Sequence, residues 1–412
     1  MWHNIRHGFV WDNDKFSTNL FAHPYHGSLY FNTARSQGYG FWESVPFAAA
    51  GSLMWEFLGE NEPASINDWI ATTIGGSALG EITHRISSLC LDDRTTGWQR
   101  VGRETLAFAV SPMRGLNRLF NGQAWRITGA TPRHDFTALP VHLSIGLGTR
   151  YLADHNSLFR GEHAPFTHLR LVYGSPFAPQ RAPYDYFDLS VTTNFTSNQP
   201  LLSEVNLLAQ LFVRDFRLNP SMQVRAGLYQ HFNYFDSEPV IDGSDEIPFK
   251  ISEAAAFGPG FIFRVAAPDG ESLITQQLFG TFIALGGSLT DNYRVGDRNY
   301  NLGSGFSLQS NTLMRVGKHL NFALRTKNYL LFTWKGYRPE TVQAIESIYL
   351  NAQGDKVHAR LNIVNFELSF PIAQALRIGW DNYYYHRSTH YADFSTVKSD
   401  TFETRLGLYW QL

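Results

Sequence analysis

The chain has 412 residues, of which 17% are charged and 15% aromatic, and its formal net charge at pH 7 is −2. This near-neutral balance offers no basic surface, so nucleic acid is not an expected partner. The single cysteine, Cys90, excludes an intrachain disulfide framework and any zinc site built from several cysteines.

The amino terminus begins MWHNIRHGFVWDND and contains no apolar core followed by a small-residue cleavage site, so we predict no signal peptide here. The most apolar run, VPFAAAGSLMWEFLG, is interrupted by Pro46 and Glu56 and is too short for a transmembrane helix. A membrane protein built from helices is therefore not expected.

Helical spacing of apolar residues predicts an N-terminal helical domain over residues 1–135. One helix is expected over 41–60, a second over 65–93, and a third over 103–120 with a break at Pro112. These mostly apolar helices need a surface to bury against. We therefore predict that they plug or cap the domain that follows them.

After this helical region the sequence alternates between apolar and polar residues, which is the period-2 pattern of strands. The final run, TFETRLGLYWQL, places Leu406 and Leu408 on one face and Arg405 on the other. About twelve such runs follow one another, each near the length that crosses a bilayer at a tilt. The pattern predicts an antiparallel barrel domain over residues 136–412.

The connections alternate between short turns, such as LNP and GKH, and long polar loops, such as TDNYRVGDRNYN, as in outer-membrane barrels. Twelve strands enclose too wide a space to fill with apolar side chains, so the apolar face should meet lipid. We predict an all-β transmembrane barrel in the bacterial outer membrane, although alternation alone also permits a soluble β-sandwich. The charged residues expected to balance one another in the lumen are Arg214, Arg225, Arg315, Arg325, Lys327, Arg377 and Arg405 with Glu204, Glu367, Asp381 and Glu403.

Four short motifs in the helical region carry a resemblance to a known family. They are His23-Pro24-Tyr25, Phe41-Trp42-Glu43-Ser44, Ile66-Asn67-Asp68, and Gly76 with Gly80. Over roughly residues 1–130 the chain resembles exported proteins of Gram-negative bacteria that share the domain of unknown function 3943. The resemblance implies an outer-membrane location and carries no established activity.

The helix expected to begin at Ser65 has a polar stripe, because Asp68 and His84 fall on one face with glycines between them. The stripe is either an ordinary packed helix face or the wall of a polar pocket. The spacing Gly76-x-x-x-Gly80 permits a close approach of another backbone. Glu81-x-x-His84 has the spacing of one half of a di-iron site, but no second copy is present. No metal and no cofactor are therefore expected.

Carboxylates in apolar helical sequence are costly to bury unless they are paired. We predict one interior polar cluster with His23 or His26 nearby, and its members are Glu43, Glu56, Asp68, Glu81 and His84. The candidates for catalysis or binding are His23, His26, Glu56, Asp68, Glu81 and His84.

Three functions are compatible with this organisation. The first is a non-enzymatic barrel with helices in or under the lumen, serving envelope structure, binding or gated transport. The second is an enzyme that modifies envelope lipids or glycans, with its site between the helices and the barrel wall. The third is an open diffusion porin. The expected partners are outer-membrane lipid, a lipid or glycan ligand, and the barrel-assembly machinery during biogenesis.

Overall fold

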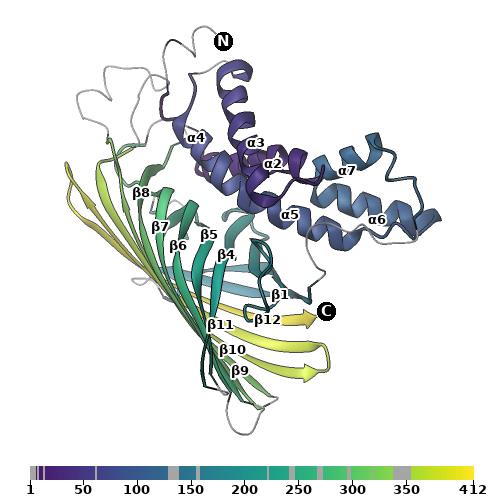
Figure 1. The fold of residues 1–412 in the computed structure, drawn as a ribbon. Coiled ribbons are helices and arrows are strands. Elements are labelled where there is room, and N and C mark those ends of the chain that lie inside the picture. Colours follow the sequence, from purple (N-terminus) through teal and green to yellow (C-terminus); the bar gives the residue numbers. More distant parts are fainter. Residues whose placement is uncertain are drawn as a thin grey trace. The chain divides into compact units, whose positions relative to one another are not determined.

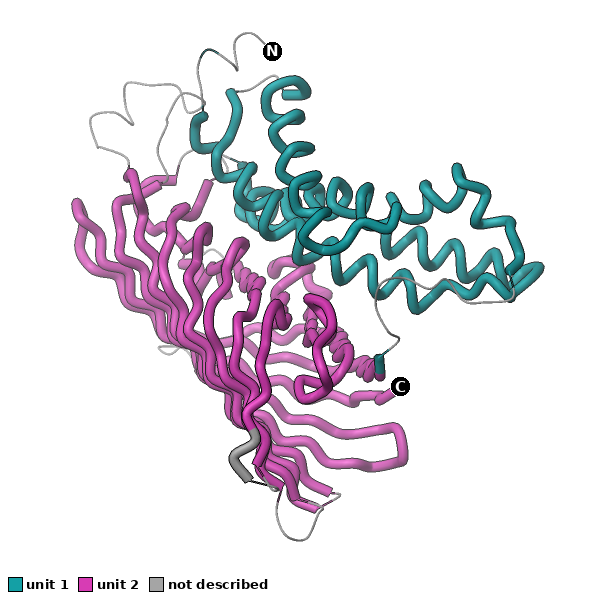
Figure 2. The backbone as a smooth tube through the Cα atoms, viewed as in Figure 1, with its two compact units in different colours: residues 1–139, 346–351 teal, residues 140–345, 352–412 magenta. Residues whose placement is uncertain are grey.

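The computed structural model describes residue 6 and residues 9–12, 14–60, 63–128, 139–154, 158–219, 222–240, 246–266, 272–294, 298–317, 319–336 and 354–412. The chain divides into a helical unit, which contains residues 1–139, and a barrel unit, which contains residues 140–345 and 352–412 (Figure 2).

The helical unit contains α-helices (Figure 1), which are joined to the short π-helical segments η1, η2 and η3. A break at Pro112 is confirmed, because α6 ends at Val110 and α7 begins at Pro112. In the described part of the chain, no helix is both long and apolar enough to span a membrane. The elements are η1 (Thr18–Ala22), α2 (His23–Arg35), α3 (Phe41–Met54), η2 (Trp55–Gly59), α4 (Ile66–Ile70), η3 (Ala71–Gly75), α5 (Gly76–Cys90), α6 (Gly97–Val110) and α7 (Pro112–Phe120).

Two glycines bring α2 against η3 and α5. A Cβ atom on Gly27 would lie 1.8 Å from the carbonyl oxygen of Thr72, and one on Gly76 would lie 2.5 Å from the Cα of Gly27. Only residues without a side chain allow two helix backbones to approach so closely. The expected close approach at Gly76 is confirmed. It holds α2 in place at Gly27, which lies about one helical turn after His23.

The barrel unit consists of antiparallel strands that close in the order β1-β12-β11-β10-β9-β8-β7-β6-β5-β4-β3-β2 (Figure 1). Pairing of β1 with β12, from Ser144 opposite Gln411 to Asp154 opposite Thr401, completes the circle. The predicted strand number is confirmed. The strands are β1 (Val141–Asp154), β2 (Glu162–Tyr173), β3 (Phe187–Asn194), β4 (Leu202–Asn219), β5 (Met222–Asp236), β6 (Lys250–Ala266), β7 (Leu273–Leu289), β8 (Tyr300–Val316), β9 (Leu320–Phe332), β10 (Val357–Ala373), β11 (Leu376–Tyr391) and β12 (Val397–Gln411).

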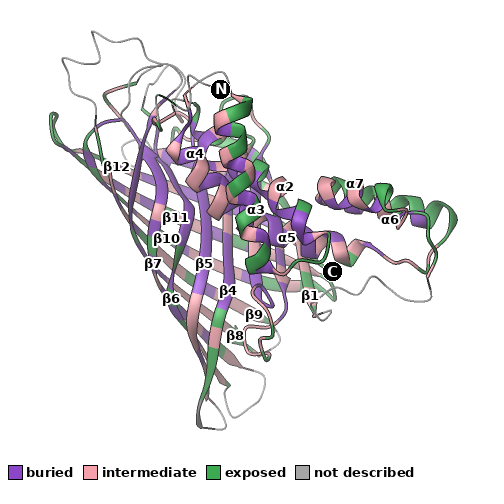
Figure 3. Cartoon of the chain, turned by 45° about the horizontal axis from the view of Figure 1, so that its top comes forward, coloured by how far each residue is buried: buried purple, intermediate pink, exposed green. Residues whose placement is uncertain are grey.

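Neighbouring positions on β11 and β12 show which face is outside. Leu406 lies opposite Trp380, and these side chains are 49% and 47% exposed. Arg405, one position earlier, lies opposite Asp381, and both are buried. Buried and more exposed residues alternate in this way along β7 and β12 (Figure 3). A closed barrel with an apolar outside and a polar inside satisfies its backbone within a bilayer, and this protein spans the bacterial outer membrane.

One strand reverses its faces partway along. The pairing of β4 with β5 shifts register between Gln210 and Phe212, which is a β-bulge. Beyond the bulge Val213 packs against an interior cluster, while Phe212 and Phe216 are exposed. Arg214 shares the face of these two phenylalanines, so the expectation that Arg214 lines the lumen is wrong.

The bulge lies just beyond the part of β4 that pairs with β3, whose last partner on this side is Ala209. The strand β3 is short, and the chain between β2 and β3 runs beside β4 instead. The side-chain amide of Gln180 donates to the carbonyl oxygen of Leu211 at 3.0 Å and accepts from the backbone N–H of Val213 at 2.9 Å. One side chain thus satisfies backbone groups that a neighbouring strand would otherwise bond.

Candidate functional site

Three metal-ligating side chains from separate segments meet in the helical unit. They are His23 at the start of α2, Asp68 in α4, and Asp12 in the segment before η1. One ligand atom from each lies within 4.8 Å of the others. The Nε2 atom of His23 is 3.4 Å from Oδ1 of Asp68, whose side chain is 2% exposed. We call these three residues the Asp–His–Asp cluster.

Asn67 holds the two aspartates of this cluster. Its side-chain amide donates to Oδ1 of Asp68 at 2.7 Å, and its side-chain oxygen accepts from the backbone N–H of Asp12 at 3.0 Å. The segment before Asp12 is fixed as well, because Val10 bonds through its backbone to Ala64 and Ile66. The cluster is therefore held by a hydrogen bond to the Asp68 carboxylate and by hydrogen bonds to the backbone at Val10 and Asp12.

Burial sets the protonation of the groups around the cluster. It lowers the pKa of His23 to about 4, against the smaller opposing effect of the Asp12 charge. It raises the pKa of Asp68 well above the usual range, and the charges of Asp12 and Glu56 raise it further. Burial also raises the pKa of Glu56 to about 8, although its carboxylate accepts from the backbone N–H of Ser65 at 2.7 Å. His23 is therefore neutral at pH 7, the form that binds a metal ion.

A second polar group lies farther along α5. Glu81 accepts from Nε of Arg35 and from Nε of Arg85, each at 2.7 Å, and all three side chains are almost completely buried. The guanidinium of Arg114 donates to the backbone carbonyl of His84 at 2.9 Å, contacts its ring, and bonds to Ser88. Glu81 is thus a paired carboxylate between two arginines, an arrangement that holds α2 to α5.

The expectation of one interior cluster is wrong. Asp68 and His84 share a stripe but are sixteen positions apart, which is about 24 Å along a helix. Glu43 is exposed and accepts from the backbone N–H of Gly40 at 2.7 Å, completing a capping box. His26 is also exposed, with its ring 6.1 Å from that of His23. Ser65 occupies the N-cap position of α4 without a side-chain capping bond.

Sequence reasoning missed Asp12. It belongs to no helix or strand, and no periodicity marks it. The only signal in the sequence is that Asp12 belongs to a short polar run, residues 12–14.

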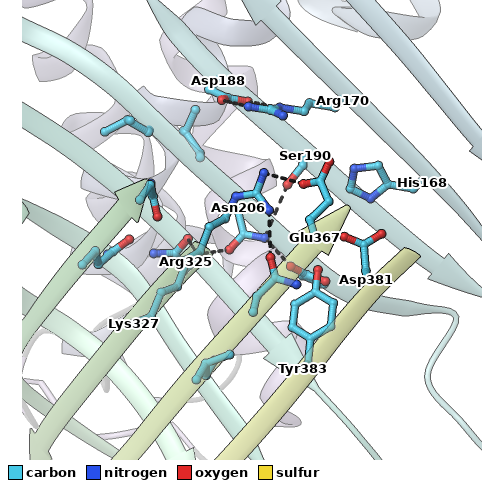
Figure 4. A pocket seen from close by; sticks show the side chains of 18 of the residues that line it. His168, Arg170, Asp188, Ser190, Asn206, Arg325, Lys327, Glu367, Asp381 and Tyr383 are labelled. Carbon is cyan, nitrogen blue, oxygen red and sulfur yellow. Dashed lines mark hydrogen bonds and ion pairs between the residues drawn. The ribbon is translucent and has the colours of Figure 1, made fainter. Parts of the chain in front are cut away.

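The barrel unit encloses a second candidate site, a cavity of about 250 Å³ inside the lumen (Figure 4). Its lining comes from opposite walls and carries charges of both signs. Those charged residues are Arg170, Arg325, Lys327, Arg377, Arg405, Asp188, Glu204, Glu367 and Asp381.

Most of these charges are paired, as expected. Arg405 bonds Glu204 at 2.9 Å and Glu403 at 2.6 Å. Arg325 bonds Glu367 at 2.7 Å.

Several of the interior bonds cross the lumen. Arg405 is on β12 and Glu204 on β4, with β1, β2 and β3 between them in the wall. Lys327 on β9 reaches Asn233 on β5 at 3.1 Å and also bonds Asn206 on β4. These strands are not neighbours, so such bonds tie one side of the barrel to the other.

A cluster of buried apolar side chains lies inside the barrel, toward the end where the long β5–β6 connection joins the strands. The ring of Phe249, just before β6, stacks on Tyr385 of β11 with centroids 4.0 Å apart. Phe235 of β5 meets Tyr329 of β9 at 6.4 Å. The polar lining expected for the lumen is therefore interrupted at this level by contacts between apolar residues of facing walls and of the β5–β6 connection.

The family model for a domain of unknown function, DUF3943, matches residues 8–113, and this stretch contains the Asp–His–Asp cluster and Glu81 with its two arginines. Residues 8–113 are a DUF3943 domain. The match takes in well under half of the chain. The family's description names no activity, so the DUF3943 domain brings no function with it.

No curated protein matches the chain. Among solved structures, the NanC porin is 12% identical, with 66% of this chain and 100% of that chain covered and a TM-score of 0.34. The KdgM porin is 9% identical over 65% and 98% of the two chains, with a TM-score of 0.25. The channel DcaP of Acinetobacter baumannii is 9% identical over 66% and 96%, with a TM-score of 0.24. At these scores the likeness supports no inference about this chain.

Proposed function

We propose that the protein is a gated outer-membrane barrel that binds a small polar solute in its lumen. The solute passes only when the side chains that bridge the lumen move apart. The observation that carries this proposal is the set of bonds across the lumen, above all that from Lys327 to Asn233.

The charges around the cavity favour a polar or zwitterionic solute. Arginine and lysine side chains line the cavity together with carboxylates, so both signs of charge are available there. A solute that replaces one partner of a pair would have to supply the same charge, because an unpaired charge is costly to leave in a narrow lumen. In this proposal the barrel selects solutes whose charged groups can replace one member of an ion pair in the lumen.

The stacked aromatic rings act as the second part of the gate. Phe249 lies in a connection rather than in a strand, so it can move without breaking the hydrogen bonds of the barrel wall. The DUF3943 domain serves in this proposal as the plug or cap of the lumen.

Single-channel conductance in planar bilayers tests the gate. We expect the wild-type protein to show little or no current. The double variant Phe249→Ala with Lys327→Ala should give resolvable openings, because it removes one contact from each layer of the closure. The matched control is Phe282→Ala, which removes an exposed aromatic ring.

Two outcomes would contradict the proposal. Steady large currents from the wild type would favour an open diffusion porin. If the correctly folded double variant shows no openings, the contacts of Phe249 and Lys327 do not form the gate. Lipid profiling of a deletion strain addresses the enzyme alternative, which requires an altered lipid or glycan species.

A further inference from the structure

We propose that Asp12, His23 and Asp68 of the DUF3943 domain bind one divalent transition-metal ion of the Zn²⁺ or Mn²⁺ class. The three side chains offer two carboxylate oxygens and one imidazole nitrogen within 4.8 Å of one another. Zinc accepts this combination of nitrogen and oxygen ligands, and three protein ligands leave a position open for water or substrate.

The histidine supplies an observation independent of the carboxylates. Its Nε2 atom is buried and makes no hydrogen bond to any residue that the structure describes. This nitrogen faces Asp68 at 3.4 Å, longer than a strong charge-assisted bond. A buried ring nitrogen normally finds a donor or acceptor. A metal ion between His23 and Asp68 would supply the missing partner.

The charge around the cluster also favours a cation. Asp12 and Asp68 place two carboxyl groups beside the His23 ring, with their ligand atoms within 4.8 Å of one another. Two arginines of the same unit, Arg35 and Arg85, pair with Glu81. A divalent ion would stabilise the ionised carboxylates and remove the repulsion between them.

The surroundings already orient the ligands. Asn67 bonds one aspartate through its side chain and holds the backbone of the other. The glycine contact between Gly27 and Gly76 holds α2, which carries His23, against α5, which follows α4 and η3 without a break. Outer bonds of this kind fix the direction of ligands before the ion arrives. Asn67 is therefore a positioning residue.

The test uses the full-length protein, folded in detergent and stripped of metal with a chelator. Titration with ZnCl₂ and, separately, with MnCl₂ is followed by calorimetry. We expect one ion per chain for at least one metal. Asp12→Asn and His23→Gln should each weaken binding by tenfold or more, and Asn67→Ala by roughly 10- to 100-fold. The matched control His26→Gln changes an exposed histidine three positions along α2 and should bind as the wild type.

A spectroscopic readout separates coordination from a loss of folding. Co²⁺ in the wild type should give visible absorption bands that are displaced by Zn²⁺ and altered in His23→Gln. Ellipticity at 222 nm checks that each variant retains its helices. Because Asp12 lies outside the helices, Asp12→Asn is the variant to compare with the wild type if His23→Gln fails to fold. Wild-type protein that binds neither ion, or a folded Asp12→Asn variant with unchanged affinity, would overturn the proposal.

Discussion

Glu56 is a buried carboxyl whose protonation depends on its place in the helical unit. Its side chain is 1% exposed, and burial is the largest cause that raises its pKa from 4.5 to about 8. Glu60 and Asp12 raise the pKa further, while the hydrogen bond from Ser65 lowers it. At pH 7 the folded chain therefore keeps a proton that the unfolded chain has lost.

This difference makes the stability of the helical unit depend on pH. Below about pH 4.5 both states are protonated at Glu56, so this group contributes no slope. Between pH 4.5 and about 8 only the folded state binds the proton, so the free energy of unfolding falls as pH rises. Above about pH 8 both states have lost this proton, and the stabilisation that it provided is gone.

We predict that Glu56→Gln weakens this pH dependence, because glutamine keeps an acceptor for Ser65 and cannot ionise. Between pH 5 and 9 the melting temperature of the helical ellipticity should fall in the wild type and fall less in the variant. A chelator in the buffer keeps metal binding out of the comparison. Glu43→Gln, at an exposed carboxylate, is the control and should keep the wild-type slope. Equal slopes in Glu56→Gln and the wild type would contradict the assignment.

Among the secondary-structure elements, β4 and β12 show two ways in which a strand meets lipid. β12 keeps one alternation to its end, with Leu406 outward and Arg405 inward. β4 changes faces at its bulge, so Arg214 shares the side of Phe212 and Phe216. The inversion puts a cation on an otherwise apolar face. Long side chains of this type place their charge at the membrane interface.

We predict that Leu406→Arg destabilises the barrel by roughly 2–4 kcal/mol, the cost of an arginine facing lipid near the middle of the bilayer. Urea unfolding in lipid vesicles measures the change. Leu412→Arg lies beyond the end of β12 and is the control, with a small expected effect. If Leu406→Arg folds with wild-type stability, Leu406 does not face lipid.

At the scale of the whole molecule, the chain consists of two units that each contain their own regular structure. The ladder from β1 to β12 closes through bonds made between barrel strands alone. The helical unit has its own buried contacts, including Phe31 with Phe41 and the arginines around Glu81. Such a division predicts that the barrel can fold alone.

We predict that a chain of residues 140–412 folds in detergent into a barrel that migrates faster on gels when unheated than when boiled. If the DUF3943 domain plugs or caps the lumen, this truncated barrel should also conduct more current than the full chain. Loss of the unheated, fast-migrating form would show that the helices are needed for barrel folding. An unchanged conductance would argue against the plug.

The sequence by itself determined the features that depend on local pattern. Alternation specified the strands, their number and the outward face of Leu406, because neighbouring side chains on a strand must point to opposite sides. Helical spacing located the segments around α3, α5 and α7. Gly76 signalled a close backbone contact, since only glycine permits one at that distance.

Tertiary structure decided what depends on partners distant in the chain. Asp12, His23 and Asp68 meet because Val10 bonds beside α4 and Gly27 packs on Gly76, and neither contact has a periodic signal. The bulge that turns Arg214 outward depends on the irregular neighbour of β4. Phe249 lies inside the barrel because its connection folds inward onto Tyr385. Each of these placements is set by the surface that a residue meets, and periodicity along one segment carries no information about that surface.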